Sequence, residues 1–273
     1  MNERTHYFHA DDLGRLELLH ARYITHRFDR HVHSGYAIGV ILAGAERFYY
    51  RGVQRHLAPA GSVVVVEPDE IHTGEAAVAA GWQYRMFYPQ VELIQEIATE
   101  LGGKSRGTPH FPETVIHDQQ VAGLLVQLHH TLDRSEDRLT RGSLARQAFG
   151  ALLRRHARHP VTPQRLGAER AVVQRVRQYL LADLADNLSL DTLAMRVGMS
   201  PFHLLRVFRA ATGQTPAAFR NQQRLIRAKA LLRAGVPITQ VALATGFSDQ
   251  SHFTNRFKRM VGVPPGEYRR QRG

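Results

Sequence analysis

Three histidines in the first third of the chain have the residue type and spacing of a metal or ligand site. One residue separates His31 from His33, and a segment that runs from Gly61 through Pro68 leads to His72. Three imidazoles can hold zinc or iron and leave one coordination position open. Histidines at strand ends also line pockets or satisfy backbone groups. We favour this second interpretation, and predict no metal, no cofactor and no catalytic residue.

The same region supplies other side chains suited to a small ligand. If the strands around these histidines close into a small barrel, its interior is wide enough for one small molecule. The side chains that we predict to line this effector pocket are imidazole, aromatic or charged: His31, His33, Tyr36, Glu67, His72 and Arg85. No single charge dominates the set, so it does not identify the effector.

Positive charge is concentrated at the other end of the chain. The net charge is +12, yet residues 1–160 carry 18 basic and 18 acidic side chains, and residues 161–273 carry 18 basic and 6 acidic ones. A basic segment beside a neutral one is typical of nucleic-acid binding by one domain. The chain has no cysteine, which excludes disulfides, thiolate metal sites and a cysteine nucleophile.

This basic segment contains an internal repeat. Ala194–Ser200 returns as Ala242–Ser248, 48 residues later, and Phe208 corresponds to Phe257, 49 residues later. Each copy has the pattern of a helix, a glycine turn and a second helix, which predicts two helix-turn-helix units. The second helices of the two units are expected to cover about 201–211 and 250–261.

A helix of about 18 residues, over 217–234, is predicted between the two units. At ~1.5 Å per residue its length is ~27 Å. Two recognition helices held at this separation can enter adjacent major grooves, which are ~34 Å apart along one face of the duplex. Further helices are expected over 168–185, 190–197 and 238–245.

In the N-terminal half, glycine and proline residues separate short apolar segments, which is typical of short antiparallel strands. Strands are expected over 36–42, 46–50, 53–57, 63–66 and 82–88, with a hairpin turn near 43–45. Helices are expected over 91–101, from 118, and over 140–157. The predicted fold class is α+β and multidomain: an antiparallel barrel that resembles a cupin (1–115), a helical region for dimerisation or packing (116–158), a linker (159–167) and an all-α domain (168–273).

Residues 168–273 resemble the DNA-binding domain of the AraC/XylS family of bacterial transcription regulators. The resemblance rests on Gly246–Phe253, followed by Phe257-Lys258-Arg259, Gly262, Pro264-Pro265 and Tyr268-Arg269. The His-x-His pair and the later Pro-x-x-x-His are similar to that family's cupin-like effector domain. The glutamate that metal-binding cupins carry soon after the histidine pair is absent.

This resemblance implies which residues face DNA. The implied base-facing positions are Phe202, Leu205, Arg206, Gln250, Ser251, Thr254 and Asn255. Arginine suits guanine, glutamine or asparagine suits adenine, and an apolar side chain suits the thymine methyl group. Leu205 departs from the polar residue that many relatives carry there. We expect phosphate contacts from His203, Arg209, Arg256, Lys258 and Arg259.

The hypothesis is a sequence-specific DNA-binding transcription regulator, an activator that responds to an unknown small-molecule effector. Its expected partners are double-stranded DNA, the effector, RNA polymerase and a second copy of the chain. We expect it in the cytoplasm, on the nucleoid when bound to DNA, with no membrane contact, because no apolar run is long enough to span a bilayer. Two alternatives remain: a metal-binding cupin enzyme with an accessory DNA-binding domain, and a constitutive DNA-binding protein.

Overall fold

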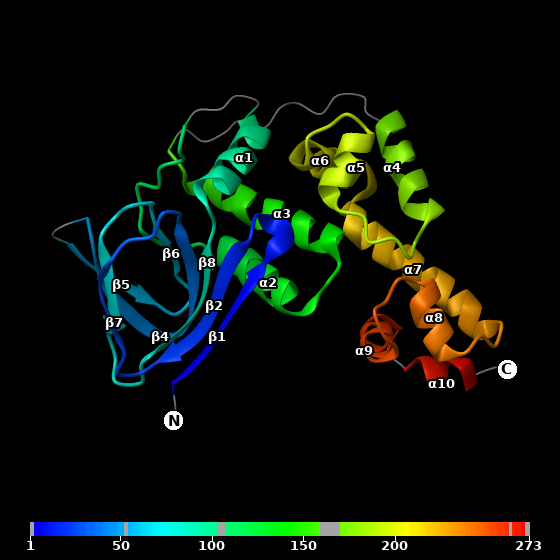
Figure 1. Cartoon of the computed structure of the whole chain (residues 1–273), viewed down its shortest axis with the longest axis horizontal. Coiled ribbons are helices and arrows are strands. Elements are labelled where there is room, and N and C mark those ends of the chain that lie inside the picture. The colour runs from blue at the N-terminus through cyan, green and yellow to red at the C-terminus, as the bar shows by residue number, and fades with distance from the viewer. Residues whose placement is uncertain (1–2, 52–53, 103–106, 159–169, 262–263, 271–273) are drawn as a thin grey trace. The chain divides into compact units, whose positions relative to one another are not determined.

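The computed structural model describes residues 3–51, 54–102, 107–158, 170–261 and 264–270. The chain forms two compact units (Figure 1), the first of residues 1–136 and 144–165, the second of residues 137–143 and 166–273. The predicted linker, 159–167, lies outside the described residues. The short segment 137–143 belongs to the second unit although it lies within the predicted helical region. Among the described residues, no helix has the length and apolar character of a membrane span.

The first unit is built on antiparallel strands arranged as two sheets that share one long strand, β4 (Ala37–Tyr50). One sheet has the order β1-β2-β8-β4-β6-β9. In the other sheet β4 pairs with β5 and β7, and β7 pairs with β3. The remaining strands are β1 (Arg4–Ala10), β2 (Leu16–Tyr23), β3 (Arg27–His31), β5 (Gln54–Pro59), β6 (Val63–Val66), β7 (His72–Ala76), β8 (Trp82–Tyr88) and β9 (Val115–Ile116).

The hairpin turn expected near 43–45 is wrong, because β4 continues through it. Gly44 adopts a positive φ of 72°, and the register with β8 shifts between Ile41 and Ala43. The register shift places the extra residue Leu42 in a bulge, and Gly44 follows it with a positive φ, so the strand bends without ending. A Cβ at Gly44 would collide with the carbonyl oxygen of Gly81. The bulge therefore lets one strand serve both sheets.

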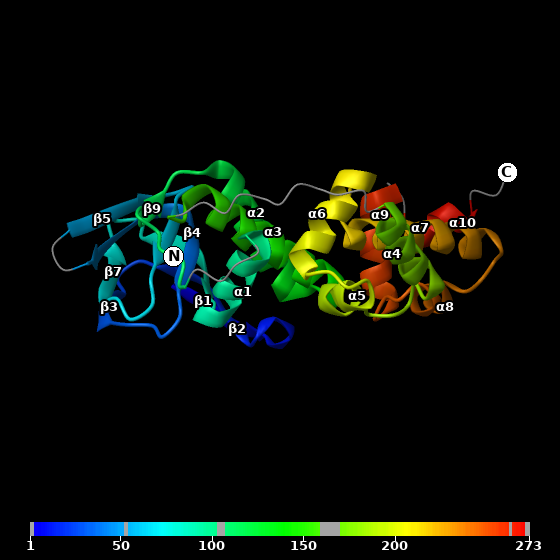
Figure 2. The same ribbon diagram turned by 90° about the horizontal axis from the view of Figure 1, so that it is seen from above.

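Helices cover one outer face of the barrel, as Figures 1 and 2 both show. They are α1 (Val91–Gly102), α2 (Gln119–Arg134) and most of α3 (Arg138–His156). Asp118 caps α2 by accepting hydrogen bonds from the amides of Gln120 and Val121. The apolar stripe of α2, Val121, Leu125, Leu128 and Leu132, is buried, and Leu124 beside it is half-buried. His129 of α2 packs edge-on against Phe87 of β8, so this helix covers its own barrel.

The second unit is helical. Its helices are α4 (Arg170–Ala182), α5 (Leu190–Arg196), α6 (Pro201–Thr212), α7 (Pro216–Arg233), α8 (Ile238–Ala244), α9 (Gln250–Val261) and α10 (Pro265–Arg270). One core cluster joins α4, α5 and α6 to the start of α7. A second cluster joins the end of α7 to α8 and α9. The predicted helix between the repeats is confirmed as α7, which has 18 residues.

Two buried arginines on α7 organise the loop between α4 and α5. Arg224 donates from Nε to the carbonyl of Leu184 at 2.6 Å, and Arg220 donates to the carbonyl of Asp186 at 3.2 Å. Arg220 also forms an ion pair with Asp137. Burial, together with the charge of Arg220, lowers the pKa of Arg224 to about 10. These cations stabilise the unit from inside and are not part of its basic surface.

Candidate functional site

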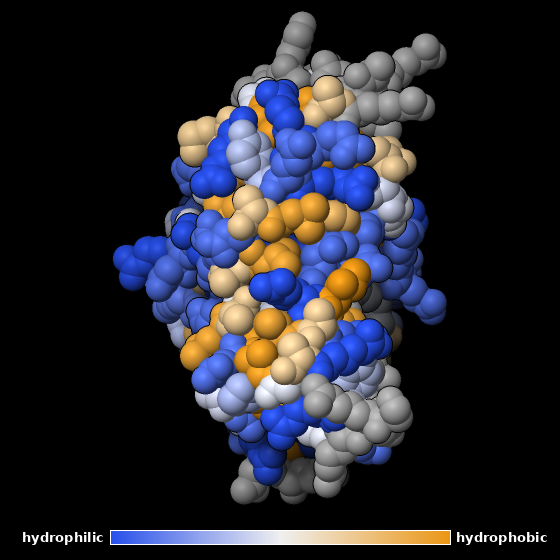
Figure 3. All heavy atoms as spheres, turned by 90° about the vertical axis from the view of Figure 1, so that its right-hand side faces the viewer, coloured by the Kyte–Doolittle hydropathy of each residue, from blue (hydrophilic) through white to orange (hydrophobic). Residues whose placement is uncertain are grey.

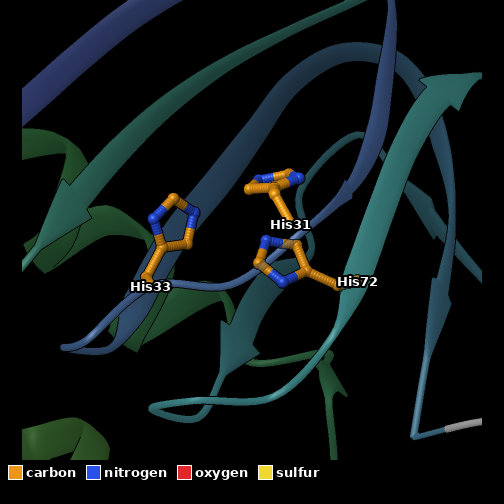
Figure 4. A group of neighbouring side chains, drawn as sticks. All are labelled: His31, His33 and His72. Atoms are coloured by element: carbon orange, nitrogen blue, oxygen red, sulfur yellow. The ribbon is translucent and has the colours of Figure 1, made fainter.

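The three histidines singled out from the sequence lie together in the barrel. His31 ends β3 and His72 begins β7, and the antiparallel pairing of these strands sets the two residues opposite each other. The ring centroids of His31 and His72 are 4.2 Å apart, and that of His33 is 5.0 Å from each. One ring nitrogen from each residue lies within 4.8 Å of the other two. Figure 4 shows the three rings grouped around a common space.

Hydrogen bonding and burial fix the state of this cluster. His72 is 7% exposed, and its Nδ1 lies 3.0 Å from the carbonyl oxygen of Glu70. Because a carbonyl only accepts, Nδ1 carries the proton and Nε2 keeps its lone pair. Burial lowers the pKa of His72, and it lowers the pKa of His33 to about 4. Both imidazoles are therefore neutral at pH 7, which is the form that binds metals and accepts hydrogen bonds.

The histidines open into a cavity of about 50 Å³ inside the barrel. By the usual requirement of roughly 10–15 Å³ for one water, it holds a few water-sized groups. Its other walls are mostly apolar or aromatic: Phe28, Ala37, Glu46, Phe48, Val64, Val66, Thr73, Tyr84, Met86 and Tyr88. Such a space suits an ion with its waters or a ligand of few atoms.

Glu46 is the carboxylic acid of this cavity. Burial raises its pKa from 4.5 to about 8, so the acid is mostly protonated at pH 7. A Cβ at Gly74 would lie 2.7 Å from Glu46 Oε1, so the glycine leaves room for the carboxyl group. Neither Glu46 nor the aromatic pair Tyr84 and Tyr88 was among the residues predicted from the sequence. The alternation along β8 was the available signal, because Tyr84, Met86 and Tyr88 share one face.

Arg85, which we predicted to line the pocket, lies on the opposite face of β8. Its neighbours Tyr84 and Met86 line the cavity, and successive side chains of a strand point to opposite faces. Arg85 is 5% exposed and donates from Nη1 to Nδ1 of His129 at 2.8 Å. Burial lowers the pKa of His129 to about 3. This pair joins the barrel to α2 and does not reach the cavity.

Tyr36 and Glu67, also predicted to line the pocket, hold the segment 109–111 instead. The fully buried Tyr36 donates its hydroxyl to the carbonyl of Pro109 at 2.5 Å. Glu67 accepts from the amide of Phe111 at 2.6 Å, and its other oxygen pairs with Arg51 at 2.9 Å. Of the six residues predicted to line a pocket, the three histidines therefore lie together at the cavity and the other three do not.

In the second unit, the first helix-turn-helix is formed by α5 and α6. Gly198 has a φ of 68°, the left-handed conformation that ends α5. Ser200 caps α6 by accepting from the amide of His203 at 3.2 Å, and Pro201 occupies the first helical position. Leu204, Val207 and Phe208 enter the core cluster, whereas Ala211 is exposed although its spacing from Val207 places it on the same side of the helix.

The second helix-turn-helix, α8 and α9, repeats this construction. Gly246 has a φ of 74°, and Asp249 caps α9 by accepting from the amide of His252 at 2.7 Å. That backbone hydrogen bond lowers the pKa of Asp249. Phe253 and Phe257 are buried in the second core cluster. A Cβ at Gly246 would lie 2.8 Å from Cα of Ala185, so this turn is packed tightly against the α4–α5 loop.

The predicted base-facing positions lie outside both core clusters. On α9, Gln250, Ser251 and Asn255 are exposed and Thr254 is half-buried. The amide oxygen of Gln250 accepts from Thr239 at 2.7 Å. On α6, Arg206 is half-buried, while Phe202 and Leu205 are each 6% exposed. The second recognition helix thus presents a mostly solvent-facing polar row, whereas on the first helix Phe202 and Leu205 are buried beside the half-buried Arg206.

The residues predicted to contact phosphates differ in their exposure to solvent. Arg209 and Lys258 are exposed, whereas His203 and Arg256 are half-buried. The side chain of Arg259 lies outside the described residues. The space-filling view in Figure 3 shows a mainly hydrophilic face with apolar groups between the polar ones. The exposed apolar residues of the second unit include Met195 and Leu243, which occupy equivalent positions in the two repeats.

Comparison with known proteins gives matches to both units. A family model for an AraC-like ligand binding domain matches residues 13–149, and a helix-turn-helix domain model matches residues 193–271. The uncharacterized HTH-type transcriptional regulator YbfI of Bacillus subtilis (strain 168) is 28% identical over 252 residues, which are 92% of this chain and 90% of that protein. The arabinose operon regulatory protein of Escherichia coli (strain K12) is 26% identical over 243 residues, 86% and 80% of the two chains.

A crystal structure of an AraC-type transcriptional regulator from Chromobacterium violaceum is also similar. It is 31% identical, with a TM-score of 0.36, and the match covers 38% of this chain and 95% of that one.

Proposed function

This chain belongs to the AraC/XylS family of DNA-binding transcription regulators, and we propose that α6 and α9 read two adjacent major-groove segments under control of a ligand in the barrel. The observation that carries the proposal is the duplicated recognition unit. Each copy has its own glycine turn, its own side-chain N-cap and its own core cluster. The two copies are joined by the single helix α7.

The length of α7 supports simultaneous binding by both units. Its 18 residues correspond to ~27 Å at ~1.5 Å per residue. Successive major grooves on one face of DNA are ~34 Å apart, and the width of the flanking units supplies the difference. We therefore propose a bipartite operator whose two halves are one helical turn apart.

The residues of each recognition helix suggest different modes of base reading. We propose that Gln250, Ser251, Thr254 and Asn255 read bases through hydrogen bonds, with Gln250 or Asn255 paired to adenine. In the other half-site, Arg206 pairs with guanine, and Phe202 and Leu205 contact thymine methyl groups. The half-site read by α6 should thus prefer G and T, and the half-site read by α9 should contain A.

Selection of binding sites from a random duplex library tests this assignment directly. The wild-type protein should yield a bipartite site, and Asn255→Ala should lose preference at one or two positions of one half only. Replacement of a base contact should cost about 1–3 kcal/mol at that position. An unchanged set of selected sites would refute the role of Asn255, and a site with only one conserved half would refute two-unit reading.

Salt dependence tests the proposed phosphate contacts. Lys258→Ala should weaken binding to all sequences alike and reduce the slope of log K against log salt by about 1. Lys229 of α7, whose ammonium group lies over the ring of Tyr268 in α10, offers a matched control, because Lys229→Ala removes the same charge from another place. Equal effects of both substitutions would indicate a general charge effect in place of a contact by Lys258.

We propose that the cavity in the barrel is the effector site, with His31, His33 and His72 as its polar wall. The mostly apolar lining supports this role, because ligand sites combine such walls with a few placed polar groups. We further propose that the chain acts as an activator with RNA polymerase, as a homodimer, in the cytoplasm and on the nucleoid when bound to DNA. Sedimentation with and without operator DNA tests the homodimer; a single chain per operator would refute it.

A further inference from the structure

We propose that His31, His33 and His72 hold one divalent transition-metal ion, Zn²⁺ or a similar ion, with an open coordination position facing the cavity. Only the role of this metal in effector recognition rests on the function proposed above; the metal site itself does not. The ligand class that follows is a small oxygen or nitrogen donor that completes the coordination of the metal.

The distances between the histidines are within reach of a single ion. In a tetrahedral zinc site the Zn–N distance is about 2.0–2.1 Å, which sets the nitrogens about 3.3 Å apart. Nitrogens at most 4.8 Å apart lie at most about 2.8 Å from a common centre. Each nitrogen therefore needs to move by less than about 1 Å, which small rotations of the side chains supply.

The backbone and the hydrogen bonding of His72 prepare the site. Strand pairing already places His31 opposite His72, so the fold itself fixes two of the three positions. The hydrogen bond from His72 Nδ1 to the carbonyl of Glu70 is the kind of supporting contact that metal-bound histidines usually make. It orients the ring and leaves the lone pair on Nε2.

The chemistry of the donors selects the class of ion. Imidazole nitrogens suit Zn, Cu, Fe and Ni, whereas Mg and Ca prefer oxygen ligands. Three protein ligands leave at least one position for water or an added ligand. The adjoining space of about 50 Å³ fits that water or a ligand of few atoms.

Glu46 lines the same cavity as the histidines. Among the described residues, no hydrogen bond or ion pair is found for its half-buried carboxyl group. This carboxyl group can therefore hydrogen-bond to a water or ligand that completes the coordination of the metal.

Titration of the metal-free, tag-free full-length protein with Co²⁺ tests the site. We expect one equivalent of Co²⁺ with the visible absorption of a low-coordinate nitrogen site, and its displacement by Zn²⁺. His33→Gln, at a half-buried position, and His31→Gln should each weaken binding at least ~100-fold. His9→Gln, which removes an exposed histidine of β1, is the matched control and should bind like the wild type.

Absence of Co²⁺ absorption in the wild type, or equal binding by the wild type and both cluster variants, would overturn the site. Circular dichroism and thermal midpoints establish that each variant is folded. If His31→Gln is unfolded, His33→Gln alone decides, because His33 follows the end of β3.

Addition of azide to the Co²⁺-loaded protein tests the open position. A shift of the absorption bands is expected, and an unchanged spectrum would refute an open position. DNA binding by the same preparations separates this inference from the proposed function. A protein that binds DNA but no metal refutes the metal site alone, and one that binds metal but no DNA refutes the proposed function alone.

Discussion

The buried ion pair between Asp137 and Arg220 should hold the second unit together. Arg220 is 1% exposed and the side chain of Asp137 is 13% exposed. Burial opposes ionisation of Asp137, but the charge of Arg220 and its hydrogen bond outweigh burial and lower the pKa of the acid. Removal of one member of a buried pair leaves a charge that nothing compensates, which typically costs about 3–5 kcal/mol.

Two substitutions separate the charge from the helix cap. Oδ1 of Asp137 also accepts from the amides of Leu139 and Thr140, at 3.1 and 3.2 Å, at the start of α3. Asp137→Asn keeps an oxygen for the cap and removes only the charge. We expect this substitution to lower the free energy of unfolding by about 3 kcal/mol, the lower end of the range for a broken buried pair, because Arg220 keeps its hydrogen bond to the carbonyl of Asp186. Asp137→Ala should lose about 1 kcal/mol more with the cap.

Native-state hydrogen exchange of the amides in α7 measures this loss locally. Fluorescence of Trp82, the single tryptophan, which lies in the first unit, reports separately on the barrel. Glu136→Ala, at the exposed neighbouring acid, is the control. Protection of α7 within about 0.5 kcal/mol of the wild type in Asp137→Asn would refute the assigned role of the pair.

The pH dependence gives the same test in the wild type. The pKa of Asp137 is lowered in the folded state from 3.8, so the unfolded chain takes up its proton first as pH falls. The contribution of the pair is complete above pH 3.8 and is lost as pH falls through the lower, folded pKa. Protection of α7 in the wild type and in Asp137→Asn should therefore converge at acid pH.

Three further changes have expected outcomes. Burial in the folded barrel lowers the pKa of His129 from 6.5 to about 3, so only the unfolded chain gains this proton between about pH 7 and pH 5. Acidification over this range should therefore reduce barrel stability by up to about 2 kcal/mol. Urea denaturation followed by Trp82 fluorescence should show a smaller loss in His129→Phe, and an equal loss would contradict this. Gly246→Ala should destabilise the second unit more than Gly198→Ala, because both glycines have positive φ but only Gly246 lacks space for a Cβ. Hydrogen-exchange protection of α8 measures the loss in Gly246→Ala, and that of α5 measures the loss in Gly198→Ala. Equal losses would contradict the tight packing assigned to Gly246. Tyr36→Phe should cost about 1–3 kcal/mol in barrel stability by leaving the carbonyl of Pro109 without its hydroxyl donor, and an unchanged urea midpoint would contradict that role.

Features set by local chemistry could be predicted from the sequence. The glycine turns at 198 and 246 and the cap at Ser200 follow from residue types that few other conformations favour. The range predicted for α9, about 250–261, is the one observed, and Asp249 caps its first turn. The grouping of His31, His33 and His72 was also foreseen, since the pair and the later histidine each stand at a strand end.

Features set by long-range packing could not be predicted in the same way. Arg85 was one of the six side chains predicted to line the pocket. Its face of β8 is covered by α2, so the arginine is buried outside the barrel against His129. The continuous β4 depends likewise on pairing with several strands, because Gly44 alone is compatible with a turn or a bulge.

The charge of the second unit shows why composition alone misassigns residues. Its excess of basic side chains indicated DNA binding, yet Arg220 and Arg224 are buried and bind backbone carbonyls of the α4–α5 loop. The two arginines are four residues apart on α7, so they share one face of the helix. Gly246 packs against the same loop, which connects the first repeat to the turn of the second. The internal arginines thus fix the two recognition units to one helix, and only the remaining surface cations are available to phosphates.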